Sequence, residues 1–272
     1  MKQRLIYIGT SFKIVEKIIE SDLFDFSIAI CEEKRVSETY RNTLIKFGIQ
    51  LITFTSKFEF ERIILQFDKR DYIFLIYQLD MIVPSNLTGN YSFFNLHAGN
   101  MATNRGAHPI IWSLLNGDSE TEFTLHKINE KIDQGIIVAK FGVIILPDDD
   151  AVSVKAKMEE GLLPLFHKLV SFLNLEFDGI PCNGGIYHKP IQEKDFTLDV
   201  FNDSKNEIEN KIRSQRQYKG AIVWIDDTKH YVTNILEWNE ADNNTCELKI
   251  DGNRLIITRH NSLISFEING YA

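Results

Sequence analysis

Short apolar runs alternate with amphipathic segments along the first hundred residues, and this alternation constrains the fold more than any other feature. The run RLIYIG at 4–9 is followed by FKIVEKIIE at 12–20, whose apolar residues share one helical face. The run YIFLIYQ at 72–78 is almost wholly apolar, which is typical of a parallel strand covered on both faces. We expect an α/β fold with a Rossmann-like, doubly wound sheet. Its predicted strands are 4–9, 26–31, 50–55, 72–78 and 93–99, and its predicted helices are 12–20, 38–48 and 57–67.

The pattern changes after residue 120. Two longer strands are predicted at 122–128 and 135–146, and one long helix at 151–173. A helix at 204–215 then leads into short strand-like runs at near-regular spacing, which indicate a small all-β unit. We therefore expect three parts: a main domain at 1–180, a linker at 181–203 and a small, OB-like C-terminal β domain at 204–272.

Charge and hydropathy narrow the classes of function. Asp and Glu outnumber Lys and Arg, 38 to 30, which gives a formal net charge of −8. Because nucleic-acid binding depends on Lys and Arg that displace phosphate counterions, this balance disfavours a nucleic-acid partner, although a local basic patch is compatible with a negative total. No apolar run approaches the roughly 18 residues that span a bilayer, and the N-terminus lacks the apolar core of a signal peptide. We expect a cytoplasmic protein with no membrane partner.

Cysteine and histidine spacing gives no sign of a metal site. Cys31, Cys182 and Cys246 lie far apart and form no Cys-x-x-Cys pair, so we expect reduced structural thiols. The remaining histidines have neither i, i+4 spacing nor a Cys partner, and no metal is expected. These histidines are His108, His126, His167, His188, His230 and His260.

Asn95, His97 and Asp133 are the candidate catalytic residues. Asn95 and His97 are alternate residues near the end of a predicted strand, where ligands bind in open α/β sheets. Asp133 lies in the turn KIDQG, which a chain reversal could bring back to the sheet edge. An amide can donate to a developing oxyanion, an imidazole can move a proton, and a carboxylate can fix the imidazole tautomer. By themselves these residues leave a second reading open, because Asn-x-His is common and strand-end polar residues often cap loops.

The wider context resembles the folate-dependent formyltransferases. The chain reads NLH at 95–97, RGAHP at 105–109, NG at 116–117, Thr124 and DQG at 133–135. That family has Asn-x-His, Arg-Gly-x-x-Pro, Asn-Gly, Thr and Asp-x-Gly in this order. The closest resemblance is to nucleotide-sugar N-formyltransferases, which are related to methionyl-tRNA formyltransferase. The chain departs from the family at 101–103, where Met-Ala-Thr replaces a common Leu-Pro, and at 9–11, where we expect a strand-end turn.

The resemblance implies a donor and a set of binding residues. The donor would be N10-formyltetrahydrofolate as co-substrate, with no metal, and Asn95, His97 and Asp133 would be catalytic. Folate would contact Gln78, Leu79, Asp80, Met81, Ile82, Val83 and Ile132. The other substrate would contact Tyr77, Arg105 and Lys189, although core packing for Tyr77 and a surface position for Lys189 remain open.

Several acceptors of the formyl group are consistent with the resemblance. The first is a dTDP-, UDP- or GDP-linked amino-dideoxy sugar of surface-glycan (O-antigen) biosynthesis; the others are methionyl-tRNA, a purine-pathway amine and water. From Lys211 onwards eight Lys and Arg face eight Asp and Glu, which weakens the tRNA alternative. The C-terminal β unit counts against a purine enzyme, and the chain length leaves no room for the regulatory domain of the hydrolases. We expect the amino sugar and keep a non-catalytic folate- or nucleotide-binding module as the rival. The sequence leaves the oligomeric state open, with a homodimer as one alternative.

Overall fold

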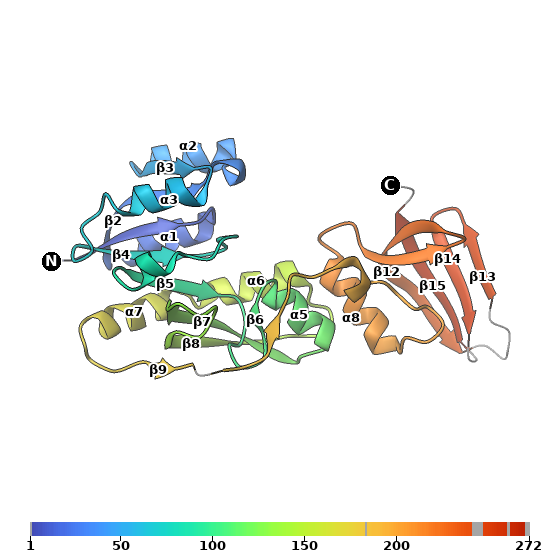
Figure 1. The fold of residues 1–272 in the computed structure, drawn as a ribbon. Coiled ribbons are helices and arrows are strands. Elements are labelled where there is room, and N and C mark those ends of the chain that lie inside the picture. Colours follow the sequence, from blue (N-terminus) through green and yellow to red (C-terminus); the bar gives the residue numbers. More distant parts are fainter. Residues whose placement is uncertain (1, 183, 241–246, 260–261, 270–272) are drawn as a thin grey trace. The chain divides into compact units, whose positions relative to one another are not determined.

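The computed structural model describes residues 2–182, 184–240, 247–259 and 262–269 (Figure 1). The chain divides into two compact units, each built from segments that are distant in sequence. The first unit comprises 1–106, 122–143 and 157–187. The second comprises 107–121, 144–156 and 188–272.

An eight-stranded mixed sheet forms the centre of the first unit. Its order is β3 (Gln50–Phe54), β2 (Phe24–Glu32), β1 (Gln3–Ile8), β4 (Tyr72–Ile76), β5 (Ser92–His97), β7 (Glu120–Lys127), β8 (Ile136–Ile144) and β9 (Ile180–Pro181). The first five strands pair in parallel, whereas β7 is antiparallel to β5 and β9 is antiparallel to β8. The chain reverses its direction of travel across the sheet between β1 and β4, so the predicted doubly wound α/β fold is confirmed. A separate two-stranded sheet pairs β6 (Arg105–Gly106) with β10 (Tyr187–His188).

Serine residues begin the first helices of this unit. The side chains of Ser11, Ser37 and Ser56 accept N–H bonds from the first turns of α1 (Phe12–Ser21), α2 (Glu38–Lys46) and α3 (Lys57–Ile64). Such caps satisfy N–H groups that have no partner inside the helix. The segment 9–11 is thus a strand-end turn that leads into the Ser11 cap. The short η1 (Glu33–Arg35) and α4 (Ser85–Thr88) follow β2 and β4.

The helix predicted at 151–173 is two helices, α6 (Ala151–Glu160) and α7 (Leu162–Leu173), with Gly161 between them. Pro164 explains the break, because it has no N–H to donate to the carbonyl of Glu160 and its ring crowds that carbonyl. Gly161 also packs so closely on Phe141 that an added Cβ would lie 2.3 Å from its ring. The expectation of one continuous helix is therefore wrong. Likewise, the helix predicted at 57–67 ends at Ile64.

The second unit pairs two helices with a five-stranded antiparallel sheet. The helices are α5 (Pro109–Asn116) and α8 (Lys205–Gln215), with the short η2 (Glu193–Asp195). The sheet order is β11 (Ala221–Ile225), β12 (Thr228–Glu240), β15 (Ser262–Asn269), β14 (Arg254–Arg259) and β13 (Glu247–Asp251). The small C-terminal β unit is confirmed as a separate antiparallel sheet, in which β11 and β13 are the edges among the described residues; its closure into an OB-like barrel stays a prediction.

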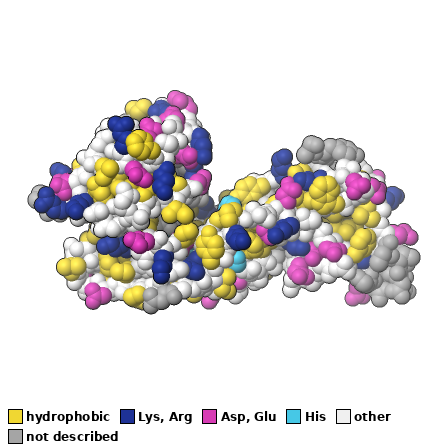
Figure 2. All heavy atoms as spheres, viewed as in Figure 1, with side chains coloured by type: hydrophobic (Ala, Val, Ile, Leu, Met, Phe, Trp, Pro, Cys, Tyr) yellow, Lys and Arg dark blue, Asp and Glu magenta, His cyan; other side chains and the backbone are white. Residues whose placement is uncertain are grey.

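Charged side chains of both signs stand among one another on the face of each unit seen in Figure 2. Cys31 and Cys182 are free thiols, whereas Cys246 and His260 lie outside the described residues. A search of the described helices finds none with the length and apolar character of a membrane span.

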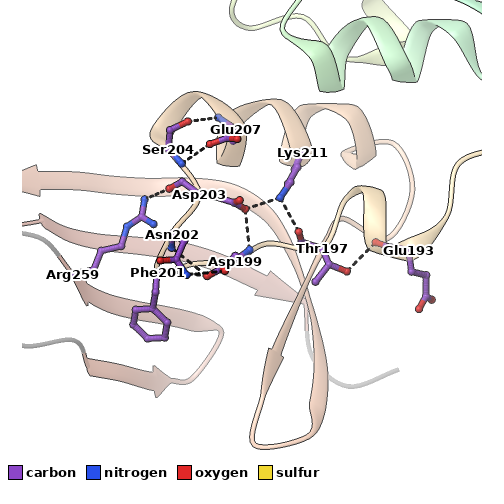
Figure 3. A network of polar contacts seen from close by, with 10 residues as sticks. All are labelled: Glu193, Thr197, Asp199, Phe201, Asn202, Asp203, Ser204, Glu207, Lys211 and Arg259. Carbon is purple, nitrogen blue, oxygen red and sulfur yellow. Dashed lines mark hydrogen bonds and ion pairs between the residues drawn. The ribbon is translucent and has the colours of Figure 1, made fainter. Parts of the chain in front are cut away.

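A polar network, which we call the Lys211 network, holds the segment before α8 to the helix and the sheet of the second unit (Figure 3). Lys211 Nζ donates to the carbonyl of Thr197 at 2.9 Å and to Asp203 Oδ2 at 2.6 Å. The backbone carbonyl of Asp203 accepts from Arg259 of β14. Ser204 and Glu207 form a capping box at the start of α8, which satisfies two further N–H groups.

Candidate active site

Asn95 faces a histidine across the sheet. In the antiparallel pairing of β5 and β7 it stands directly opposite His126, and Asn95 Nδ2 lies 3.1 Å from His126 Nε2. His126 is only 1% exposed, so its ring cannot exchange this contact freely for water. The strand pairing therefore joins two side chains that are 31 residues apart.

His97, the last residue of β5, is buried, and its ring is fixed at one nitrogen. Nε2 lies 2.7 Å from the carbonyl oxygen of Asn104. A carbonyl can only accept, so Nε2 carries the hydrogen and donates it. Neutral His97 therefore has its free lone pair at Nδ1. Thr124 stands opposite His97 and donates to the carbonyl of Gly99 at 3.0 Å, which ties the loop after β5 to β7.

Asp133 lies between the two imidazoles. Its Oδ2 is 3.7 Å from His97 Nδ1, and its Oδ1 is 3.6 Å from His126 Nε2. The backbone N–H of Gly106 donates to Oδ2 at 2.8 Å. We call Asn95, His97, His126 and Asp133 the site cluster.

The turn that presents Asp133 depends on local backbone features. Asn129 closes it by donating from Nδ2 to the carbonyl of Gln134 at 2.8 Å. Asp133 itself has φ 48°, a left-handed conformation that Asp tolerates better than most residues. A Cβ at Gly135 would lie 1.6 Å from the carbonyl oxygen of Lys127, so only glycine fits there. The Asp-x-Gly spacing thus has a steric cause.

Electrostatics keep the carboxylate charged and favour the neutral imidazole. Burial works to raise the pKa of Asp133, but His126, His97 and the Gly106 N–H outweigh it and lower the pKa to about 2. Burial lowers the pKa of His97 below its ordinary value and outweighs the raising effect of Asp133. At neutral pH the cluster therefore contains an ionised Asp133 beside a His97 whose Nδ1 can accept a proton.

The predicted folate-binding segment, residues 78–83, follows β4 at the place where the order of the strands in the sheet reverses. Gln78 has φ 59°, and its carbonyl accepts from Arg35, which also pairs with Asp80 at 3.2 Å. Gly9, Thr10, Arg35, Gln78 and Leu79 are among the residues that line a small hollow there. Leu79, Met81 and Val83 pack against the core, whereas Ile82 and Ile132 are exposed apolar side chains.

The three predicted substrate residues lie in different surroundings. Tyr77 is 1% exposed, and its ring packs edge-on against Phe123 at 5.7 Å. This burial supports the core alternative and gives the ring no open face for stacking. Arg105 is also buried and donates from Nη2 to the carbonyl of Gly185 at 2.7 Å. Lys189, exposed in the second unit, accepts at its backbone carbonyl from Trp112 Nε1 at 3.2 Å.

His126 belongs to the cluster although the sequence analysis did not assign it a role in the site. The antiparallel register of β5 and β7 places His126 opposite Asn95, and this pairing is visible only in the structure. Among the described residues no group of three or more His, Cys, Asp or Glu side chains could hold a metal ion. The two oxygens of Asp133 face different rings, so the site cluster does not converge on one point.

Comparison with known proteins agrees with the motifs that surround this cluster. Residues 69–163, which include all four of its residues, match the family model described as formyl transferase. Over these residues the chain is similar to formyl transferases. A curated relative, the bifunctional polymyxin resistance protein ArnA of Wigglesworthia glossinidia brevipalpis, is 30% identical over 167 residues, which is 59% of this chain. The match spans 25% of that relative's length.

Solved structures that resemble this chain extend beyond the formyl transferase domain. A 4-N formyltransferase from Francisella tularensis has a TM-score of 0.68 and 19% identity, and the match covers 84% of this chain and 95% of that one. An N-formyltransferase from Helicobacter canadensis, in complex with folinic acid and dTDP-3-aminofucose, has a TM-score of 0.68 and 17% identity. This second match covers 97% of this chain and 98% of that one, so the fold is shared over nearly the whole length of both.

Proposed function

We propose that this chain transfers a formyl group from N10-formyltetrahydrofolate to the primary amine of a nucleotide-linked amino sugar. The observation that carries the proposal is the site cluster itself. An amide, a neutral imidazole and an ionised carboxylate lie within contact distance inside the residues that match the formyl transferase family. These are the groups that acyl transfer to an amine requires.

The chemistry follows from the protonation states. The amine attacks the formyl carbon and produces a tetrahedral intermediate with a negatively charged oxygen, which an N–H of Asn95 stabilises. His97 Nδ1 accepts the proton that the amine nitrogen must lose, and the 3.7 Å contact with Asp133 favours the imidazolium that results. Breaking the bond from carbon to folate N10 regenerates the carbonyl, and His97 returns the proton to N10. Atoms and charge balance without a metal.

The folate segment fits a flat, partly apolar donor. Arg35 fixes the Gln78 carbonyl and the Asp80 carboxylate, so the backbone that follows β4 is held in place. Ile82 and Ile132 offer apolar surface that a ring system can cover. The hollow beside Gln78 is lined by residues that follow the carboxyl ends of β1 and β4, where the strand order reverses, and open α/β sheets bind ligands at such a position. The Helicobacter canadensis neighbour, whose structure contains folinic acid, supports the same donor class.

The acceptor class rests on charge and on the neighbours. One structural neighbour is a 4-N formyltransferase and another is bound to a dTDP-3-aminofucose, so we propose a 3-amino or 4-amino sugar on dTDP, UDP or GDP. Arg105 and Lys189 stay the predicted contacts of the diphosphate. The charge balance from Lys211 onwards, eight Lys and Arg against eight Asp and Glu, gives little support to methionyl-tRNA. The product would enter surface-glycan assembly, and the free thiols of Cys31 and Cys182 are consistent with a cytoplasmic enzyme. The homodimer stays a prediction.

An acceptor panel tests the proposal. The full chain is incubated with formyltetrahydrofolate and, in turn, 3-amino and 4-amino sugars on each nucleotide, methionyl-tRNA, and no acceptor. We expect tetrahydrofolate to be released only when an amino sugar is present, as measured by absorbance. The sugar product should then carry one formyl group. Turnover with methionyl-tRNA and with none of the amino sugars would show that the proposed acceptor is wrong. Binding of formylfolate without any turnover would favour the non-catalytic module.

A further inference from the structure

His126 has no role in the chemistry described above, yet it is the group that contacts both Asn95 and Asp133. We propose that His126 is a positioning residue that orients the amide of Asn95 by accepting one of its two N–H groups at Nε2. The second N–H is then left for the developing oxyanion. This inference rests on the proposed function and deepens it.

An amide at this place needs to be oriented. The terminal torsion of an Asn side chain is broad and roughly two-fold, so rotation exchanges the NH2 group with the carbonyl oxygen at little cost. With the oxygen turned toward the substrate, Asn95 would repel an oxyanion instead of stabilising it. The 3.1 Å contact with His126 holds Nδ2 on the side of β7 and excludes that alternative as long as the bond persists.

The contact also fixes the tautomer of His126. An amide nitrogen can only donate, so Nε2 must carry the lone pair and neutral His126 must carry its hydrogen at Nδ1. Asp133 Oδ1 also attracts a hydrogen on Nε2, and this attraction contributes to the lowered pKa of Asp133. At 3.6 Å, however, Oδ1 lies outside hydrogen-bond distance, whereas Asn95 Nδ2 lies within it. The shorter contact therefore decides the state of Nε2.

Burial shows what this arrangement costs. His126 Nδ1 is buried and has no hydrogen-bond partner among the described residues. A buried polar atom without a partner is unfavourable. Placing the ring where Nε2 meets Asn95 leaves Nδ1 in this position, beside Gly135. The geometry thus favours the contact with Asn95 over complete hydrogen bonding of the ring.

Two substitutions separate orientation from packing. In His126→Gln the side-chain oxygen can accept from Asn95 in place of Nε2, whereas His126→Leu fills much of the space without an acceptor. We expect kcat to fall about tenfold to a hundredfold in His126→Leu, less than the hundredfold to thousandfold typical when an oxyanion donor is removed. KM for both substrates should change little, and His126→Gln should recover most of the rate. His230→Leu, the same change at a buried histidine of the second unit, is the control and should leave kcat unchanged.

The tautomer provides a readout that does not depend on activity. In the full chain labelled with 15N-histidine, the His126 signal, identified by its loss in His126→Leu, should have the pattern of an Nδ1–H tautomer. An Nε2–H pattern, or wild-type kcat in a folded His126→Leu, would overturn the inference. If the wild type turns over no acceptor at all, the proposed function fails, whereas the NMR result still decides whether His126 accepts from Asn95.

Discussion

The site cluster and the Lys211 network are both built from polar side chains, but they differ in how completely their hydrogen bonds are satisfied. In the Lys211 network Lys211 makes two bonds of 2.6 and 2.9 Å, and Asp199 and Asp203 accept further N–H bonds. In the site cluster the carboxylate lies 3.6 and 3.7 Å from the two imidazoles, and His126 Nδ1 has no partner among the residues that the structure describes. A network whose groups bond mainly to one another stabilises structure, whereas one with open positions can bind reacting atoms.

The two clusters also differ in the elements that hold them. The Lys211 network joins residues close in sequence around the start of α8, together with Arg259 of β14 (Figure 3). The site cluster joins β5, β7 and the turn before β8, so its geometry depends on strand register and on Gly135. We therefore expect substitutions in the site cluster to change activity more than stability, and substitutions in the Lys211 network to do the reverse.

The largest expected effect is loss of turnover in Asn95→Ala. Removing one oxyanion donor typically lowers kcat by about 10²–10³, or about 2.7–4 kcal/mol, because the transition state alone needs it. Asn95 is only partly buried, so the melting temperature should stay close to that of the wild type. Steady-state kinetics with the best acceptor measures the loss of turnover, and thermal unfolding of the same samples measures the melting temperature. A rate like that of the wild type would show that the open positions of the site cluster are not catalytic.

The opposite pattern is expected for Lys211→Met. The side chains of Lys211 and Asp203 are 20% and 13% exposed, and loss of the lysine leaves Asp203 mostly buried without its cation. Removing one partner of a fully buried pair costs about 3–5 kcal/mol, so we expect about 2–3 kcal/mol for this partly exposed one. Denaturant unfolding measures the loss, and kcat at a temperature where the variant is folded should be unchanged.

Lys205→Met is the matched control for that change. Lys205 lies in the same helix, and it is an exposed residue that approaches Glu209 at 3.7 Å. Exposed pairs contribute at most about 1 kcal/mol. Equal destabilisation by the two substitutions would mean that the Lys211 network contributes no more than a surface ion pair.

The features that the sequence predicted well depend on local patterns. Apolar runs and helical periodicity predicted the strands and most helices of the first unit, and the positions of Asn95 and His97 predicted that both lie near the end of β5. Asp133 required the motif context, because nothing local shows that its turn returns to β5. The break before α7 was also predictable, since Pro164 stands in the printed sequence and cannot donate to Glu160.

What the sequence did not predict depends on contacts between distant strands. His126 was one histidine among several until the register of β5 and β7 placed it opposite Asn95. Tyr77 follows β4 directly, and the sequence could not tell a ring at the substrate from one against Phe123. Both outcomes are decided by which element lies beside the strand, and a single sequence does not contain that pairing.

Acid should destabilise the site cluster at a higher pH than the Lys211 network, and this effect should be smaller than those of Asn95→Ala and Lys211→Met. The folded-state pKa of His97 is lowered, so between that value and about 6.5 the unfolded chain binds more protons than the native one. Stability contributed by neutral His97 is therefore present above about pH 6.5 and lost as pH falls below it, by at most about 1.4 kcal/mol per pH unit. The Lys211 network contains Asp199 and Glu207, whose pKa values are lowered by hydrogen bonds from Asn202 and Ser204 respectively. The stability that this network contributes is therefore lost only at the acidic pH where carboxylates titrate. NMR titration of His97 should give a midpoint below 6.5, and the fall in unfolding free energy from pH 7 to 5.5 should shrink in His97→Gln. A midpoint above 6.5 would mean that Asp133 outweighs burial, and one above 7 would mean that His97 is mostly charged, not a base, at neutral pH.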